Sequence, residues 1–239
     1  MSNDYFNFKN FTIHQKITKA KITTDSILIG ALVNKNHNIY LDIGTGTGVI
    51  ALMIASQNEN AKIDALEIDV DSYNEAKYNF EISNWKNNIN IIQEHLQNYE
   101  KNTIKKYDAI VCNPPFYNAT FLSPDKARNN ARQIINLPFE QLIISTKKLL
   151  IYPNGKFHVI IPFSLRTSFV NIALKHKLFL NEALEIIDNK KSIRILMQFS
   201  FNEEYLGAKK FKIRENNKYT DEYNNILKTF FCCPTRIRT

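Results

Sequence analysis

A glycine-rich turn between a short apolar run and a helix constrains the fold of this chain more than any other feature. Residues 39–43 (Ile-Tyr-Leu-Asp-Ile) are typical of a buried strand. They lead into Gly44-Thr45-Gly46-Thr47-Gly48, and residues 48–57 then have helical spacing. A strand, a glycine turn and a helix in this order favour a nucleotide-binding unit, because a turn without side chains lets the backbone approach a ligand closely.

A carboxylate at the end of the next strand strengthens this interpretation. Residues 61–67 form a second apolar run that closes on Glu67. Glu67 lies about 20 residues after the glycine turn, where a carboxylate can accept hydrogen bonds from the hydroxyls of a ribose. We therefore predict that Gly44, Gly46, Gly48 and Glu67 bind a cofactor that carries a nucleoside.

A second turn predicts the chemistry. Asn113-Pro114-Pro115-Phe116 follows the strand expected at residues 107–112. The amine of a base or of a side-chain amide is a poor nucleophile, because its lone pair is delocalised into a π system. The Asn113 side-chain oxygen and a backbone carbonyl of the turn can accept hydrogen bonds from such an amine, and the prolines keep the turn stiff. The Phe116 ring offers a stacking surface.

Taken alone, Asn-Pro is also a common way to start a turn. Only the combination with the glycine turn and the acidic strand end favours a methyl-donor site. We accordingly predict one catalytic turn, formed by Asn113, Pro114, Pro115 and Phe116.

The rest of the sequence alternates strands with helices, which predicts a parallel sheet covered on both faces. Two strands near residues 182–188 and 193–201 are joined by Asn189-Lys190-Lys191, which indicates an antiparallel hairpin at the sheet edge. We expect residues 1–38 to form a substrate-side extension packed on the core and residues 39–231 to form the main domain. Residues 232–239 are expected to be a disordered tail. The other expected strands lie at 89–93 and 156–161, with a short strand or hairpin at 5–14, and the expected helices lie at 24–33, 70–83, 138–150, 164–178 and 219–230.

The charge balance indicates a polyanionic partner. The 239 residues include 31 Lys and Arg against 23 Asp and Glu, a formal net charge of +8. Aromatic residues such as Phe8, Phe11 and Phe211 lie among the basic ones, a mixture that suits RNA. Further basic clusters occur at residues 190–194 and 209–214. The predicted RNA-binding residues are Lys9, Lys16, Lys19, Lys21, Lys126, Arg128 and Arg132. The alternative is that the two arginines only pair with nearby carboxylates.

Other classes of protein are disfavoured. No apolar run approaches the length of a transmembrane helix, and the polar N-terminus lacks the apolar segment of a signal peptide. Three cysteines provide neither a disulfide framework nor the spacing of a zinc site. We expect a cytoplasmic protein that binds no metal, does not associate with membranes and acts as a monomer.

The two turns together resemble those of class I S-adenosylmethionine-dependent N-methyltransferases. Such enzymes have a Rossmann-like α/β fold, with a mostly parallel seven-stranded sheet, an antiparallel edge hairpin and helices on both faces. Residues 8–15, 23–31 and 127–132 are similar to the bacterial tRNA1(Val) adenine-N6 methyltransferases. The resemblance covers residues 5–231. It implies S-adenosylmethionine as cofactor, tRNA as partner and N6 of adenosine 37, next to the anticodon, as the methylated atom.

The resemblance also implies further cofactor contacts. Asp42, Thr45, Ile68 and Asn113 belong to the implied cofactor site. Glu94 and His95 both occupy the place where such enzymes hold the adenine of the cofactor, and the sequence leaves the two as alternatives.

Three other functions stay open. A protein glutamine N5-methyltransferase uses a similar turn but usually carries a helical N-terminal domain, and only 38 residues precede the first core strand here. A DNA adenine methyltransferase needs a target-recognition insertion larger than the segment after Phe116. A non-catalytic RNA-binding module on a decayed methyltransferase fold is disfavoured by the intact glycines, Glu67 and Asn113.

Overall fold

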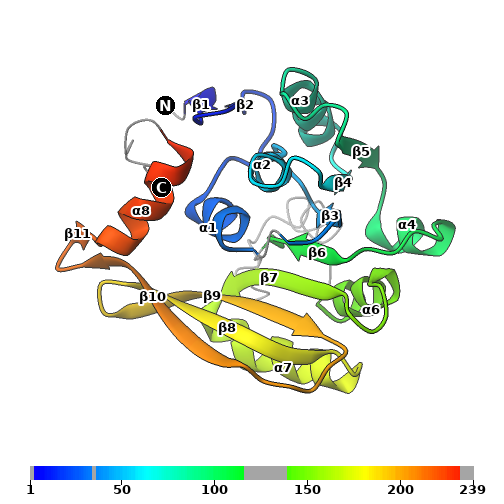
Figure 1. Cartoon of the computed structure of the whole chain (residues 1–239), viewed down its shortest axis with the longest axis vertical. Helices are drawn as coiled ribbons and strands as arrows, with labels where there is room; N and C mark the ends of the chain where they lie inside the picture. Colours follow the sequence, from blue (N-terminus) through cyan, green and yellow to red (C-terminus); the bar gives the residue numbers. More distant parts are fainter. Residues whose placement is uncertain (1–2, 34–35, 116–138, 232–239) are drawn as a thin grey trace, which may run out of the picture.

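A nine-stranded sheet forms the centre of the part of the chain that the structure describes (Figure 1). The structure is a computed structural model that describes residues 3–33, 36–115 and 139–231. The strand order is β11-β10-β8-β9-β7-β6-β3-β4-β5. The strands are β3 (Ile39–Ile43), β4 (Lys62–Glu67), β5 (Ile89–Gln93), β6 (Ala109–Cys112), β7 (Lys156–Pro162), β8 (Phe179–Asp188), β9 (Lys191–Ser200), β10 (Gly207–Glu215) and β11 (Lys218–Tyr219).

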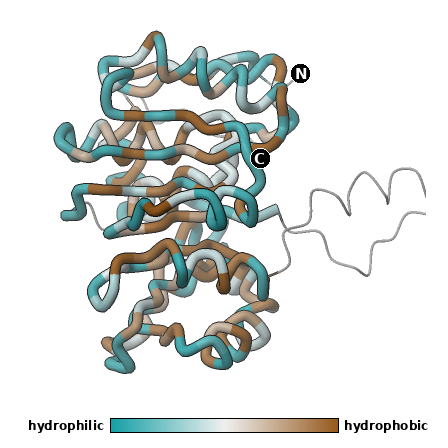
Figure 2. The backbone as a smooth tube through the Cα atoms, turned by 90° about the vertical axis from the view of Figure 1, so that its right-hand side faces the viewer, coloured by the Kyte–Doolittle hydropathy of each residue, from teal (hydrophilic) through white to brown (hydrophobic). Residues whose placement is uncertain are grey.

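Helices cover both faces of this sheet, as predicted. The helices α1, α2, α3 and α8 lie on one face, and α4, α6 and α7 lie on the other (Figure 1). Each central strand feeds both cores: Ala109 and Val111 point to the first face, and Ile110 and Cys112 to the second. This explains why the strands are continuous apolar runs, visible as brown segments in Figure 2. The helices are α1 (Thr24–Leu32), α2 (Val49–Ala55), α3 (Val70–Glu81), α4 (Leu96–Asn102), α6 (Phe139–Leu149), α7 (Arg166–Lys175) and α8 (Asp221–Phe230), with a 3-10 turn η2 (Phe163–Leu165).

The fold class is confirmed, and the sheet is longer than the seven strands expected. The strands β8 and β9 form the predicted antiparallel hairpin, but it does not lie at the edge, because β10 pairs in parallel with β8. Phe211 and Ile213 of β10 are buried against α8, while the lysines between and beside them face solvent. This alternation of buried and exposed residues is typical of a half-buried strand. In the sequence the segment was interpreted only as a basic cluster, and the strand was not predicted.

The N-terminal segment is a small antiparallel hairpin of β1 (Tyr5–Asn7) and β2 (Thr12–His14). The Phe8 ring stacks on Phe11 with centroids 4.3 Å apart and packs on Phe231 at 4.6 Å. Phe8, Phe11 and Phe211 are all buried core residues. The interpretation of these three rings as RNA-stacking surfaces was therefore wrong, because burying a large apolar side chain stabilises the fold by about 1.5–3 kcal/mol and leaves no ring face for a base.

The strand order reverses between β3 and β6. Along the chain, β3, β4 and β5 add in one direction, whereas β6 adds on the other side of β3. All four strands are parallel, so their carboxyl ends share one edge, with Ile43 of β3 beside Leu66 of β4 and Cys112 of β6. Ligands of open α/β sheets bind at such a reversal, and both turns singled out in the sequence follow strands that end there.

Candidate active site

The glycine turn between β3 and α2 has a backbone that favours glycine at three positions. Gly44, Gly46 and Gly48 have φ of 70°, 58° and 82°, a region that residues with a Cβ rarely adopt. A Cβ on Gly46 would lie 3.2 Å from the Cβ of Ala20, and one on Gly48 would lie 2.4 Å from the Phe80 ring. A Cβ on Gly44 would meet no atom within 4 Å. Gly46 and Gly48 thus serve packing, whereas Gly44 borders open space that a ligand can fill.

Glu67 ties this turn to the end of β4. Its carboxylate is buried; Oε2 accepts from the amide of Gly46 at 2.9 Å, and Oε1 accepts from the amides of Ile68 at 2.8 Å and Asp69 at 3.0 Å. A carboxylate offers about four lone-pair directions, so these three donors leave room for a further hydroxyl. Glu67 is therefore both a support of the turn and an acceptor at the ligand edge.

Asp42 and Thr45 hold the turn from inside. Asp42 is fully buried, and its Oδ2 accepts from the Thr45 hydroxyl at 2.6 Å. Its other oxygen, Oδ1, is buried without a hydrogen-bond partner. Burial raises the pKa of Asp42 to about 7, although the Thr45 hydroxyl lowers it. Both side chains are closed to solvent, so they shape the site from beneath.

The end of β5 places Glu94 closer to the site than His95. The Glu94 amide donates to the Glu67 carbonyl at 3.1 Å, and the Glu94 side chain is half-buried. His95 is exposed and begins α4 without a side-chain capping bond. Ile68 follows Glu67 and is 37% exposed, which leaves an apolar surface at the same edge. This geometry favours Glu94 over His95 for contact with a planar group beside Ile68.

Asn113 emerges from β6 directly beside the glycine turn. Since Cys112 pairs with Ile43, the residues that follow them, Asn113 and Gly44, leave neighbouring strands together. Asn113 is half-buried, Pro114 is buried and Pro115 is exposed. Phe116, Lys126, Arg128 and Arg132 lie outside the described residues.

Comparison with known proteins decides the family. Residues 19–167 match the family model described as the methyltransferase small domain. A protein of Flavobacterium psychrophilum named tRNA1(Val) (adenine(37)-N6)-methyltransferase is 36% identical over 231 residues, which cover 95% of this chain and 98% of that protein. A protein of the same name from Pseudoalteromonas translucida is 35% identical and matches over 95% of this chain and 97% of its own length. This chain belongs to the tRNA1(Val) (adenine(37)-N6)-methyltransferase family.

Solved structures share the fold of this family member. A predicted O-methyltransferase from Agrobacterium tumefaciens superposes with a TM-score of 0.64 at 13% identity, covering 86% of this chain and 96% of its own. P. horikoshii TYW2, solved in complex with MeSAdo, has a TM-score of 0.57 at 13% identity and covers 84% of this chain and 74% of its own. At these identities the comparison supports the Rossmann-like methyltransferase architecture and nothing narrower.

In this methyltransferase, residues 14–23 form a strap between β2 and α1 that is fastened to α3. The buried Glu75 carboxylate accepts from the amides of Ile17 at 3.0 Å and Thr18 at 2.7 Å. Asn79, fully buried, accepts from the His14 amide at 2.8 Å and donates to the carbonyl of Thr47, in the glycine turn, at 2.9 Å. The strap therefore lies against the glycine turn, with Ala20 beside Gly46.

Sequence reasoning missed Glu75 and Asn79. Their signal is faint: together with Ser72 they recur on one side of α3 at a helical spacing of three and four. Polar residues in that pattern ordinarily mark the solvent face of a helix. Here the side of α3 that they occupy is closed by the strap, so the acid and the amide are buried.

The structure brings three of the four N-terminal lysines to the strap. Lys16 and Lys19 are exposed there, and the Lys21 ammonium donates to the carbonyl of Gln15. Lys9 lies elsewhere, in a hollow with Ser56 and Gln57, and donates to the carbonyl of Lys228. Ser56 follows the far end of α2, so Lys9 is separated from the glycine turn by the length of that helix, about 10 Å.

The described part of the chain contains neither a metal-ligating cluster nor a membrane-spanning helix. No group of three or more His, Cys, Asp or Glu side chains in residues 3–33, 36–115 and 139–231 is arranged to hold a metal ion. Within the same ranges no helix has the length and apolar composition needed to cross a membrane.

Proposed function

We propose that this protein transfers a methyl group from S-adenosylmethionine to N6 of adenosine 37 of a valine tRNA. The observation that carries the proposal is the register of β3 and β6, which sets Asn113 beside Gly44 at the point where the strand order reverses. The names of the relatives, 35–36% identical over nearly the full chain, support tRNA as the substrate.

The residues present fit the cofactor. The open space beside Gly44 suits a ligand that lies against the backbone. Glu67 has acceptor capacity left for a ribose hydroxyl, and Glu94 with Ile68 can flank the adenine. When bound, S-adenosylmethionine supplies an electrophilic methyl group on a sulfonium.

The protein activates the adenine through hydrogen bonds. The Asn113 side-chain oxygen and a carbonyl of the catalytic turn accept from the N6 amine, so its lone pair localises and points at the methyl group. Acceptors fixed before the reaction stabilise the positive charge that develops on N6 as it attacks. The nitrogen–methyl bond would form as the sulfur–methyl bond breaks and leaves a neutral thioether, and the methylated N6 would then lose one proton to water. Holding both reactants in line removes most of the entropic cost of their encounter.

The tRNA loop must bring its base into this edge of the sheet. A loop base is only partly stacked, so its extrusion costs little. Lys16, Lys19 and Lys21 on the strap border the edge and can neutralise phosphates. We assign the same role to Lys126, Arg128 and Arg132, which follow the catalytic turn in the sequence. The acting unit in this proposal is a cytoplasmic monomer, and no metal takes part.

One assay tests the proposal. Methyl transfer from tritiated S-adenosylmethionine is measured into bulk tRNA, DNA and protein side by side, followed by nucleoside analysis. We expect label in tRNA alone, recovered as N6-methyladenosine, and loss of labelling when adenosine 37 of the valine tRNA is replaced by guanosine. Label in DNA or in protein, or undiminished labelling of the substituted tRNA, would contradict the proposal.

A further inference from the structure

Two neighbouring turns form a second basic surface near the candidate active site. They are the β8–β9 turn at Asn189-Lys190 and the β10–β11 turn at Asn216-Asn217, together called the turn pair, and they lie side by side beneath α8 (Figure 1). The Asn189 amide donates to the Arg214 carbonyl at 2.8 Å, and the Asn217 amide donates to Asn189 Oδ1 at 2.7 Å. The two turns are thus hydrogen-bonded to each other.

The turn pair projects past the end of the neighbouring strand. The last residue of β7, Pro162, pairs with Arg194 of β9, whereas β9 itself begins at Lys191. Three residues of strand rise about 10 Å. The turns therefore overhang the end of β7 by about that distance.

An ion pair links the strand that follows the first of these turns to the segment beside the glycine turn. The Arg194 guanidinium of β9 donates to Asp25 Oδ2 at 2.6 Å, at the start of α1. Asp25 is five residues after Ala20, which packs against Gly46, and five residues span at most about 18 Å. Lys191 is three residues before Arg194, about a further 10 Å along the strand, so the turn pair lies on the same side of the sheet as the place where the tRNA base is proposed to enter.

Three lysines on or beside the turn pair form no ion pair with any described residue. Asp188 is bonded to Arg214 Nε at 2.7 Å, and Glu215 is paired with Lys212 at 2.6 Å. The remaining basic residues Lys190, Lys191 and Lys218 are exposed, and no carboxylate of the described residues lies within 4 Å of their ammonium groups. Beside them Tyr219 is 39% exposed and stacks on Tyr223 at 5.2 Å.

We propose that the turn pair binds backbone phosphates of the tRNA stem next to the loop that enters the active site. This inference rests on the proposed function. Three exposed lysines without ion-pair partners among the described residues, placed on an overhang, favour a polyanion, and the exposed Tyr219 ring beside them suits RNA. Lys190, Lys191 and Lys218 each contact a phosphate, and they position the stem without reading its sequence.

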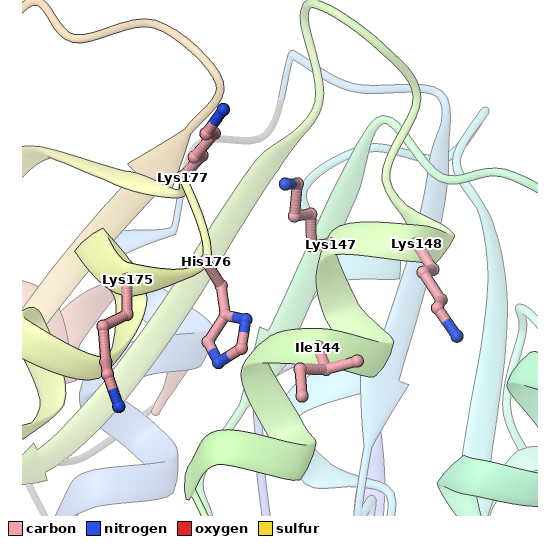
Figure 3. A pocket seen from close by; sticks show the side chains of 6 residues that line it. All are labelled: Ile144, Lys147, Lys148, Lys175, His176 and Lys177. Carbon is pink, nitrogen blue, oxygen red and sulfur yellow. The ribbon is translucent and has the colours of Figure 1, made fainter.

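A second basic cluster is placed differently. Lys147, Lys148, Lys175, His176 and Lys177, with Ile144, line a hollow of about 600 Å³ between α6 and α7 (Figure 3). It lies at the carboxyl ends of both helices, the opposite edge of the sheet from the catalytic turn. Lys175 and Lys177 point in opposite directions in Figure 3, Glu140 pairs with His176, and Glu100 pairs with Lys148. We therefore use this cluster as the control.

The test compares two triple variants of equal charge. One is K190Q/K191Q/K218Q, and the control is K147Q/K175Q/K177Q. Binding of valine tRNA is measured by fluorescence anisotropy across a salt titration, together with steady-state methylation. We expect the turn-pair variant to bind tRNA about tenfold or more weakly at low salt, with a log–log salt slope shallower by about 2, because each lost phosphate contact removes about 0.7–0.9. The loss should appear in KM for tRNA, and the control should bind as wild type does.

Two results would overturn the inference: a turn-pair variant that binds like wild type at every salt concentration, or a control variant that is the weaker of the two. Failure of the proposed function looks different, since the wild-type protein would then leave tRNA unlabelled in the bulk assay. Normal tRNA methylation with an unchanged KM in K190Q/K191Q/K218Q would reject the turn pair alone.

Discussion

Asn113 is the side chain on which the proposed chemistry depends. In the proposed mechanism it accepts a hydrogen bond that gains strength only as N6 attacks, so its removal should affect turnover more than binding. We predict that Asn113→Ala lowers kcat by about 10²-fold or more and leaves the affinity for S-adenosylmethionine nearly intact. Single-turnover kinetics with valine tRNA and calorimetry with the cofactor measure the two quantities. A variant that turns over at the wild-type rate would remove Asn113 from the mechanism.

Substitutions can separate the structural role of Glu67 from its proposed role in cofactor binding. Its oxygens accept from the amides of Gly46, Ile68 and Asp69, and in the proposed function its charge also serves the ribose. Glu67→Ala should weaken cofactor binding by roughly 1.5–3 kcal/mol, because it removes a charge-assisted acceptor. Glu67→Gln keeps one acceptor oxygen and should lose less. Calorimetry on both variants checks this order, and unchanged affinity in Glu67→Ala would rule out the ribose contact.

His158 makes stability depend on pH. It is buried on β7, its Nε2 has no hydrogen-bond partner, and burial lowers its pKa to about 3. The unfolded chain binds this proton below about pH 6.5 and the folded chain does not, so stability falls as the pH drops from 6.5 toward 3, by at most about 1.4 kcal/mol per pH unit. We predict that Tm declines less steeply between pH 7 and 5 in His158→Leu than in wild type.

Asp42 changes the stability with pH in the opposite direction to His158. The effect of His158 must therefore be measured as the difference in Tm between wild type and His158→Leu. The raised pKa of Asp42 keeps a proton on the folded state, so its contribution to stability is present below about pH 3.8 and is lost as the pH rises to about 7. Both proteins share Asp42, and its effect cancels in the difference. Parallel Tm profiles for wild type and His158→Leu would show that His158 does not titrate on unfolding.

At the scale of elements, α3 acts as the anchor of the strap. Glu75 accepts two strap amides, and its loss would free the segment that covers Gly46. We predict that Glu75→Gln, which keeps the shape but lacks the charge, weakens cofactor binding several-fold and leaves the kcat of the saturated enzyme within about twofold. Glu81→Gln, an exposed acid on the same helix, is the matched control. Equal affinities in the two variants would show that the strap does not depend on Glu75.

The elements differ in how far the sequence predicts them. The runs at residues 39–43 and 89–93 match β3 and β5 residue for residue, because each is a short, mostly apolar segment rich in isoleucine. The strand β10 was not predicted because Phe211 and Ile213 are its only buried apolar residues, and lysines surround them. The burial of Glu75 cannot be predicted from the residues around it, since its hydrogen-bond partners lie 57 and 58 residues away in the chain.

In the whole molecule, the positions of the candidate site residues could be predicted from the strands they follow, whereas the positions of the surface lysines could not. The glycine turn and Asn113 each follow a strand and Glu67 ends one, so the rule that parallel strands end at one edge of a sheet accounts for their meeting. The positions of the lysines followed no such rule. Lys9 and Lys16 are seven residues apart, yet the hairpin between them sends Lys9 toward α8 and Lys16 to the strap. Surface charges have no local pattern that reveals which edge they reach.

The contact between Phe8 and Phe231 has a consequence for the order in which the protein is completed on the ribosome. The amide of Lys9 donates to the carbonyl of Phe230, so the N-terminal hairpin is held by residues that are made more than two hundred positions later. At about 5–20 residues per second, that interval is roughly ten seconds or more. The strap can dock much earlier, as soon as α3 has emerged. The proposed cofactor edge can therefore assemble on a nascent chain, while the Phe8 ring has only Phe11 beside it until Phe231, directly after α8, has been synthesised.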